Sequence, residues 1–345
     1  MNTNIQEFKP LIKPNQMREI LPVTPQITNF VNETRNEISD IISGKSSKKL
    51  FIVGPCSIHD VDQALEYAKL LKNIADTIKD KILIVMRVYF EKPRTTIGWK
   101  GLINDPLLND SYNVNKGLYL ARELLLNINS IGLACGYEVL DTITPQYISD
   151  LMSWGAIGAR TTESQVHRQM VSGLSMPVGF KNGTGGDKLI AADAILSASF
   201  PHCFMGITDA GEPAICKTKG NKNCHVILRG GKDGPNFSPE HVQIMTEILN
   251  KKNVEPSIMI DCSHGNSKKD FKNQSGVLEN VIETMNKYNN VIGVMIESNI
   301  NEGKQKLTNG KDGLKYGVSI TDSCISIQET NIILKKAYQD IQSKN

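Results

Sequence analysis

The stretch from residue 82 to residue 101 joins a strand-like apolar run to a loop that could bind an anion. Residues 82–88 are apolar apart from Arg87, a pattern typical of a buried parallel strand. The loop after them carries basic and hydroxyl side chains, with only Glu91 to offset the charge: Lys92, Arg94, Thr95, Thr96 and Lys100. Ammonium, guanidinium and hydroxyl groups are the donors that a phosphate accepts. Arg87 alone would fit a structural ion pair equally well, but the loop favours an anion site.

Other strand-like runs also end near a polar or ionisable side chain. In chain order these residues are Cys56, Arg87, Glu138, Arg160, Lys181, Arg229, His264 and Glu297, and Asp322 lies in a later loop. The cations among them would repel one another unless an anion lay between them. Guanidinium groups bind phosphate and carboxylate through paired hydrogen bonds. The sequence therefore predicts a site for a small anion that carries both a phosphate and a carboxylate, bound by Arg87, Arg160, Lys181 and Arg229.

The remaining strand-end residues suggest a metal site. Cys56, His264, Glu297 and Asp322 would offer a thiolate, an imidazole and carboxylates, which suit a borderline divalent transition metal. No short spacing joins them, so the prediction depends on their shared position at strand ends. Cys56 could instead be a buried core thiol and Asp322 could cap a turn.

A regular alternation of apolar runs and amphipathic patterns would bring these strand ends together. The predicted strands are 50–55, 82–88, 132–139, 156–160, 178–181, 225–229, 257–261 and 291–297. The predicted helices are 60–79, 115–127, 144–153, 163–173, 187–199, 238–251, 275–287 and 327–340. This alternation predicts an α/β fold, a (β/α)8 TIM barrel with its active site at the carboxyl ends of the strands. An open doubly wound sheet is the alternative.

Two segments lie outside this alternation. Residues 1–47 predict an N-terminal arm with a helix near 24–42, either loosely packed or docked on a neighbouring subunit. An apolar run near 203–217 has no helix before the next strand, so it predicts an inserted β-hairpin. The expected division is therefore an arm over 1–47 with oligomer or regulatory contacts, and a catalytic barrel over 48–345.

Composition excludes several classes of protein. The chain of 345 residues has a net charge of +3 and no long basic run, so we expect no nucleic-acid partner. No apolar run is long enough to span a bilayer, and the N-terminus lacks a signal-peptide pattern. The seven cysteines are scattered without a Cys-x-x-Cys motif, which favours a reducing cytoplasm.

Six motifs together resemble the type I 3-deoxy-D-arabino-heptulosonate 7-phosphate (DAHP) synthases. They are Gly-Pro-Cys-Ser-Ile-His-Asp, Met-Arg-Val-Tyr-Phe-Glu-Lys-Pro-Arg-Thr-Thr, Gly-Ala-Arg-Thr-Thr-Glu-Ser-Gln, Gly-Phe-Lys-Asn-Gly-Thr, Ile-Leu-Arg-Gly-Gly and Asp-Cys-Ser-His-Gly-Asn. The resemblance covers residue 50 to the C-terminus and, more loosely, the arm. It implies the first step of the shikimate pathway, in which phosphoenolpyruvate condenses with erythrose 4-phosphate and water and phosphate is released.

The resemblance also implies roles for individual residues. The implied phosphoenolpyruvate contacts are Arg87, Lys92, Arg160, Lys181 and Arg229, with the backbone of Gly158 and Ala159. The implied erythrose 4-phosphate contacts lie in the loop with Lys92, Arg94 and Thr95. The implied metal ligands are Cys56, His264, Glu297 and Asp322, and manganese, iron, cobalt and zinc all suit them. Lys92 is the expected proton donor, and either Glu138 or His264 is expected to help activate the water.

The resemblance further implies a feedback-inhibited homodimer or homotetramer. The inhibitor would be an aromatic amino acid bound at Gln146, Leu174, Ser175, Phe204 and Gly206. Glycine at 206 leaves room for a phenol hydroxyl, so tyrosine is favoured over phenylalanine and tryptophan. Two alternatives remain at this stage: a 3-deoxy-D-manno-octulosonate 8-phosphate synthase, which uses arabinose 5-phosphate, and a catalytically silent sugar-phosphate sensor.

Overall fold

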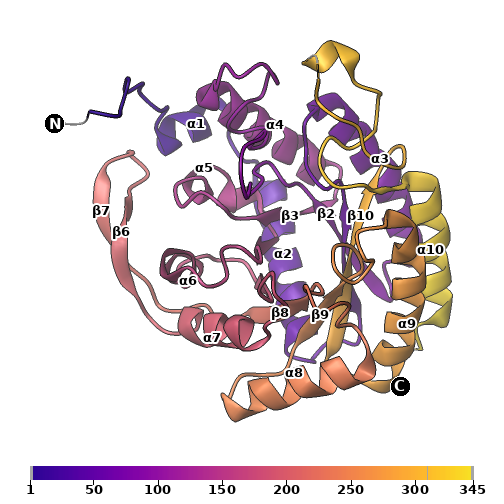
Figure 1. The fold of residues 1–345 in the computed structure, drawn as a ribbon. Coiled ribbons are helices and arrows are strands. Elements are labelled where there is room, and N and C mark those ends of the chain that lie inside the picture. Colours follow the sequence, from indigo (N-terminus) through magenta and orange to yellow (C-terminus); the bar gives the residue numbers. More distant parts are fainter. Residues whose placement is uncertain (1–2, 309, 343–345) are drawn as a thin grey trace.

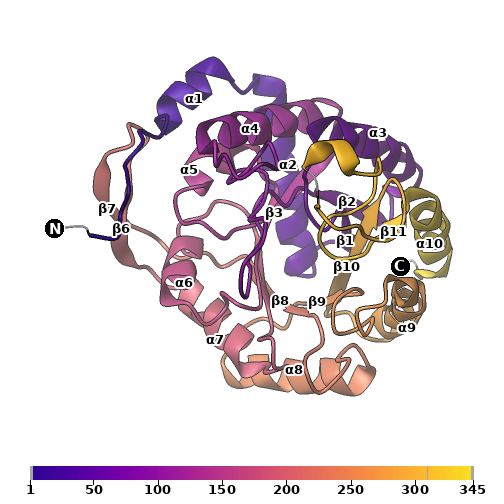
Figure 2. The same cartoon turned by 45° about the horizontal axis from the view of Figure 1, so that its top comes forward.

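Eight parallel strands form a closed barrel in the computed structural model, which describes residues 3–308 and 310–342 (Figures 1 and 2). The strands are β1 (Lys49–Gly54), β2 (Ile82–Arg87), β3 (Ala134–Glu138), β4 (Trp154–Ile157), β5 (Val178–Lys181), β8 (Cys224–Leu228), β9 (Ile258–Asp261) and β10 (Val291–Asn299). Each pairs with the next, and β1 also pairs with β10. This closure confirms the TIM barrel, and the open-sheet alternative is wrong.

Helices surround the barrel and bury one apolar face against it. The main ones are α3 (Val61–Ile78), α4 (Val114–Ser130), α6 (Gln165–Val171), α7 (Leu189–Ala198), α8 (Pro239–Lys251), α9 (Gln274–Lys287) and α10 (Ile327–Asp340). A two-residue strand, β11 (Ile325–Ser326), extends the sheet beside β10. Among the residues that the structure describes, no helix is long and apolar enough to cross a membrane.

The predicted helix over 144–153 is wrong in length. The structure has one turn of α-helix, α5 (Pro145–Ile148), followed by the 3-10 turn η1 (Ser149–Leu151). Arginine side chains from other elements bind carbonyl groups of this segment, two of which a longer helix would use internally. Arg122 donates to the Tyr147 carbonyl, and Arg35 donates to the carbonyls of Ser149 and Met152.

Helix α2 (Pro25–Ile42) closes one end of the barrel, although it lies within the predicted arm. Its Ile38, Ile41 and Ile42 form one buried cluster with side chains of the barrel strands, including Leu50 and Trp154. Burial of these side chains stabilises the fold by about 1.5–3 kcal/mol each. Much of the arm therefore belongs to the core of the barrel.

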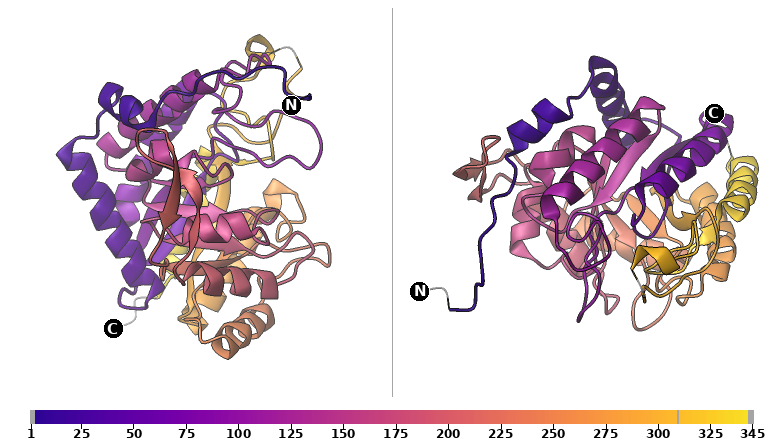
Figure 3. Two further views of the ribbon diagram at one scale, coloured as in Figure 1. Left: turned by 90° about the vertical axis from the view of Figure 1, so that its left-hand side faces the viewer. Right: turned by 90° about the horizontal axis from the view of Figure 1, so that it is seen from above.

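The predicted insertion is confirmed as an antiparallel hairpin of β6 (Cys203–Ile207) and β7 (Pro213–Lys217). It projects from the barrel beside the N-terminal segment and helix α1 (Pro14–Ile20) (Figures 2 and 3). Arg18 of α1 joins the two, because its guanidinium donates to the Asp209 carboxylate at 2.9 Å and to the Gln146 carbonyl at 2.7 Å.

Candidate active site

A cleft of about 650 Å³ lies at the carboxyl ends of the strands. The predicted cations line it together with two of their predicted neighbours: Arg87, Lys92, Arg94, Thr95, Ala159, Arg160, Lys181 and Arg229. Gly158 lies behind this lining, where an added Cβ would be 2.6 Å from Glu138 Oε1. The structure therefore brings the predicted cations together around one cleft.

The expectation that every strand ends on one of these residues holds only in part. Arg87, Glu138 and Lys181 are the last residues of β2, β3 and β5. Arg160 is not in a strand, because β4 starts earlier than predicted and ends at Ile157. The carbonyl of Gly158 then accepts hydrogen bonds from the next turn, and this turn exposes Arg160.

Arg87 makes a structural ion pair and also keeps one donor unpaired, so both roles that the sequence left open stay compatible with the structure. It is fully buried, stacks 4.0 Å from the Tyr89 ring centre and pairs with Glu297 at 3.0 Å. Among the described residues, its Nη1 has no hydrogen-bond partner, although Arg87 lines the cleft. A buried guanidinium with an unused donor is suited to an incoming anion.

Lys181 and Glu138 form a second buried pair, 3.1 Å apart. Burial by itself raises the pKa of Glu138, but Lys181, Lys92 and Arg87 outweigh it and lower the pKa to about 2. Glu138 is thus a carboxylate at neutral pH, the form it would need in order to help activate the water, a role that the resemblance implies for either Glu138 or His264.

This shift predicts acid sensitivity. The unfolded chain binds a proton at Glu138 near its ordinary pKa of 4.5, whereas the folded protein does so only near pH 2. The free energy of unfolding should therefore fall as the pH decreases from about 4.5 to 2. Urea unfolding at a series of pH values gives the slope of the unfolding free energy against pH, which measures the protons taken up on unfolding. Between pH 4.5 and 2 this slope should be smaller in Glu138→Gln than in the wild type, by up to about one proton. An unchanged slope would contradict the assignment.

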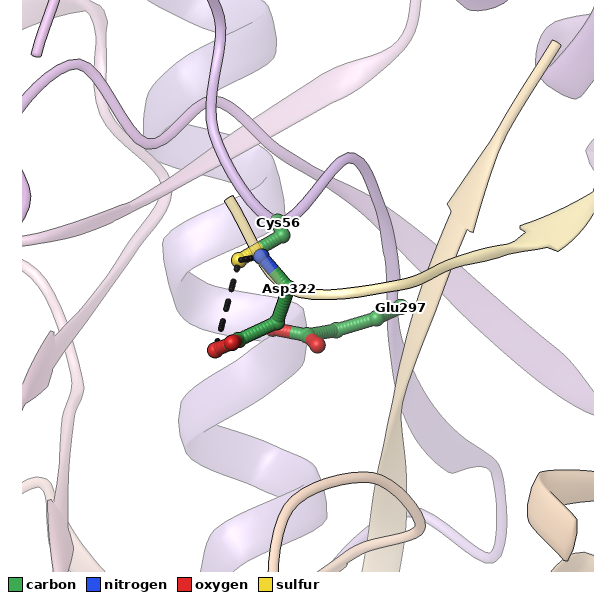
Figure 4. Close-up of side chains that lie close together, drawn as sticks. All are labelled: Cys56, Glu297 and Asp322. Carbon is green, nitrogen blue, oxygen red and sulfur yellow. Dashed lines mark hydrogen bonds between the residues drawn. The ribbon is translucent and has the colours of Figure 1, made fainter. Parts of the chain in front are cut away.

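The predicted metal ligands are close together. Ligand atoms of Cys56, Glu297 and Asp322 all lie within 4.8 Å of one another (Figure 4). Burial and the nearby Glu297 raise the pKa of Cys56 to about 11. Carboxylates gathered around a thiol repel the thiolate, and a divalent cation would remove this repulsion. The donor set therefore fits the metal that the sequence predicted.

His264 lies beside this cluster. Its Nε2 is 3.7 Å from Glu297 Oε1, and its Nδ1 is 2.8 Å from Asp261 Oδ2. The backbone of His264 is left-handed, with φ of 53°, a conformation that is uncommon for this residue type and typical of functional loops. The Asp261 carboxylate lies against Nδ1, and Nε2 lies on the side of Glu297, the arrangement common in metal-binding histidines.

Lys92, in the loop after β2, contacts the cluster of Cys56, Glu297 and Asp322. Its Nζ lies 3.1 Å from the Cys56 carbonyl and 3.2 Å from Cys56 Sγ. Burial lowers the pKa of Lys92. The nearby Cys56, Glu138 and Glu297 together raise it by more, so the net shift of the pKa is upward. Lys92 is therefore a protonated group between the cation-lined cleft and the metal-type cluster.

Several residues in and near the cleft were not predicted from the sequence. Glu91 does not offset the loop's charge, because it is buried and accepts hydrogen bonds from Tyr137 and Thr144. Three loop lysines also line the cleft: Lys232, Lys269 and Lys304. Lys232 and Lys269 lie just after motifs, Arg229-Gly-Gly and the one that contains His264, whereas Lys304 has no such signal.

The residues predicted for an inhibitor occupy the side of the barrel near the hairpin. Phe204 and Gly206 share one face of β6 with Cys216 and Ala214 of β7, which pair with them. Gln146 is in α5, while Leu174 and Ser175 follow α6. The Arg18 contacts join the hairpin turn to α5, so these elements are physically connected.

A closed barrel with a cation-lined cleft beside a thiol–carboxylate cluster defines a TIM-barrel enzyme for small anionic substrates. Comparisons with known proteins identify the family within this class. The model of the DAHP synthetase I family matches residues 22–335. The chain therefore belongs to the DAHP synthetase I family.

Individual relatives are similar over nearly their whole length. The Tyr-sensitive phospho-2-dehydro-3-deoxyheptonate aldolase of Escherichia coli is 49% identical over 99% of this chain and 96% of its own. The Phe-sensitive enzyme of the same organism is 50% identical over 99% of this chain and 97% of its own. The solved structure of the Francisella tularensis aldolase superposes with a TM-score of 0.96, at 50% identity, covering 98% of this chain and 99% of that one.

Proposed function

We propose that this protein is a DAHP synthase, which condenses phosphoenolpyruvate with erythrose 4-phosphate and water and releases phosphate. The observation that carries the proposal is the arrangement of the cleft, where the predicted cations adjoin the Cys56, Glu297 and Asp322 cluster. Family membership supports it independently. The silent-sensor alternative is disfavoured, because every predicted catalytic side chain lies in or beside this cleft.

In this proposal the cations bind phosphoenolpyruvate. Arg87 and Lys181 are buried, and Arg160 and Arg229 lie nearer solvent, so an anion carrying two acidic groups can contact both pairs. Arg160 Nε also donates to Thr95 Oγ1 at 3.1 Å. This bond links the phosphoenolpyruvate residues to the loop of Arg94 and Thr95, which we assign to the sugar phosphate.

The residues that would hold a divalent metal are Cys56, His264, Glu297 and Asp322. The chemistry that a bound divalent ion supplies is polarisation of the aldehyde carbonyl of erythrose 4-phosphate. Lys92 then donates its proton to the alkoxide that forms as C3 of phosphoenolpyruvate attacks this carbonyl. The water that adds at C2 gives its proton to Glu138, and phosphate leaves. His264 cannot take this proton while it is a ligand, because its ring nitrogens would then face the metal and Asp261.

Phosphate release tests the reaction and the sugar together. We expect release with phosphoenolpyruvate and erythrose 4-phosphate, and little or none when arabinose 5-phosphate replaces the four-carbon sugar. A preference for arabinose 5-phosphate would favour the octulosonate synthase instead. No release with either sugar would support the silent sensor.

We also propose that tyrosine inhibits the enzyme at the site of Gln146, Leu174, Ser175, Phe204 and Gly206. The relatives include both Tyr-sensitive and Phe-sensitive enzymes at nearly equal identity, so identity alone does not choose the inhibitor. The argument for tyrosine is the space left by glycine at position 206.

A serine at 206 should therefore change the inhibitor. Its Cβ would lie 2.7 Å from Cys216 Sγ, so Gly206→Ser should be combined with Cys216→Ala to avoid distorting the hairpin. In the double variant we expect inhibition by tyrosine to weaken about 10-fold or more, and phenylalanine to become the better inhibitor. Cys216→Ala alone is the control and should keep the tyrosine preference. A double variant that still prefers tyrosine would refute the pocket-size argument.

Two further expectations accompany this function. All seven cysteines are free, as suits a reducing cytoplasm. Met205 and Ile215 on the hairpin are 93% and 75% exposed, and Phe8 of the N-terminal segment is 78% exposed. Exposed apolar side chains of this size favour a homodimer or homotetramer, which sedimentation would test.

A further inference from the structure

Gln274 is a buried residue that the proposed chemistry does not use. It is the first residue of α9 and is fully inaccessible to solvent. Its side-chain amide makes two hydrogen bonds to the backbone of Glu297. The Glu297 N–H donates to Gln274 Oε1 at 2.9 Å, and Gln274 Nε2 donates to the Glu297 carbonyl at 2.9 Å.

The barrel explains why Glu297 needs this partner. In a parallel sheet the N–H and C=O groups of alternate residues face the same neighbouring strand. The Met295 carbonyl accepts from Cys262 N–H at 2.8 Å, so the backbone groups of Glu297 face the same side. Strand β9 ends at Asp261, however, whereas β10 continues to Asn299. Glu297 therefore faces the position where β9 no longer supplies a partner.

Strand β9 ends early because its chain turns into the loop that carries His264. The left-handed φ of 53° at His264 belongs to this turn. The loop thus brings the histidine to the cluster but leaves two backbone groups of Glu297 without a strand. Buried backbone groups that lack a partner are costly, and the Gln274 amide satisfies both.

We infer that Gln274 is a positioning residue for the metal site, acting through the backbone of Glu297. The carboxylate of Glu297 is held separately, by Arg87 at 3.0 Å and by Ser263 Oγ at 2.9 Å. Those bonds set the orientation of the carboxylate, while Gln274 sets the place of the main chain from which it extends. The inference rests on the proposed function, because it takes the cluster to be a metal site.

The test is metal affinity in the absence of substrates. Gln274→Met keeps the length of the side chain and removes both hydrogen bonds. Metal-free protein would be titrated with Co²⁺, followed by visible absorption and calorimetry, and its melting temperature measured. We expect Co²⁺ to bind about 10–100-fold more weakly than to the wild type, which is typical for loss of a group that supports a ligand.

Asn129→Leu is the matched control. Asn129 is also buried, and its Nδ2 donates to the carbonyls of Leu125 and Leu151 at 2.8 and 3.0 Å. It is not among the residues that line the cleft. Both variants should melt at lower temperature than the wild type, but only Gln274→Met should lose Co²⁺ affinity.

Wild-type affinity in Gln274→Met would overturn the inference and leave the proposed function intact. An equal loss of affinity in Asn129→Leu would overturn it too, because the effect would then be general destabilisation. A wild-type protein that binds no Co²⁺ would overturn both proposals. If Gln274→Met does not fold, Gln274→Ala replaces it, since water can enter the space left by the side chain. A loss of about 10-fold is expected there, and unchanged affinity would again overturn the inference.

Discussion

Replacing Lys92 by methionine should lower kcat by about 10²–10⁴-fold, the usual contribution of a positioned general acid. Methionine keeps an unbranched side chain of similar length but cannot donate a proton. Lys92 Nζ is 3.2 Å from Cys56 Sγ, and its pKa is held above the ordinary value by Cys56, Glu138 and Glu297 despite burial. These contacts keep the ammonium protonated where the alkoxide would form.

The measurement is single-turnover kinetics with both substrates, together with phosphoenolpyruvate binding by calorimetry. Binding should weaken but stay measurable, because Arg87, Arg160, Lys181 and Arg229 remain. Lys100→Met is the matched control, since Lys100 lies on the same loop but is exposed and does not line the cleft. Near wild-type turnover in Lys92→Met, or an equal loss in Lys100→Met, would refute the assignment of Lys92 as proton donor.

Removal of metal should abolish activity. After treatment with a chelator and gel filtration, we expect turnover at the assay background and recovery on addition of Mn²⁺, Fe²⁺, Co²⁺ or Zn²⁺. The physical reason is that the neighbouring cations Lys92 and Arg87 contact Cys56 and Glu297 but are not Lewis acids, whereas a divalent ion would also polarise the carbonyl. Full activity of rigorously metal-free protein would eliminate the metal proposal.

Cys56→Ser identifies where the metal binds. A hydroxyl is a far weaker ligand than a thiolate, so the loss of metal affinity should exceed the 10–100-fold typical of losing a supporting group. Cys135→Ser is the control, because Cys135 is equally buried but lies in the apolar layer between strands and helices. If both variants, or neither, lose metal affinity, Cys56 is not a ligand.

Local sequence was sufficient for the parts of the protein that depend on neighbouring residues. Apolar runs bounded by turn residues predicted each barrel strand, and the lack of a crossover helix predicted the hairpin of β6 and β7. The clustering of Arg87, Lys92 and Arg94 around one strand end also predicted an anion site. The strand and hairpin predictions are confirmed, because strand formation and side-chain alternation have short periods that a single stretch of chain displays. The anion site stays a prediction.

Local sequence failed where a distant partner decides the conformation. The helix predicted over 144–153 ended after one turn because Arg35 and Arg122 bind its carbonyls from other elements. Glu91 turned into the core because Tyr137 and Thr144 supply hydrogen bonds there. The sequence does not mark the arginines or Tyr137 as partners of these groups, because they lie far along the chain and come close only in the folded protein.

The metal-type cluster depended on closure of the barrel. Cys56 and Asp322 are 266 residues apart, and no spacing in the sequence connects them. Cys56 comes beside Glu297 because β1 pairs with β10, and Asp322 joins them because β11, which follows it, pairs with the end of β10. The role inferred for Gln274 has the same origin, because only the different lengths of β9 and β10 leave the backbone of Glu297 in need of a side-chain partner. Residue types thus set which groups were available for chemistry, and strand closure set which of them meet.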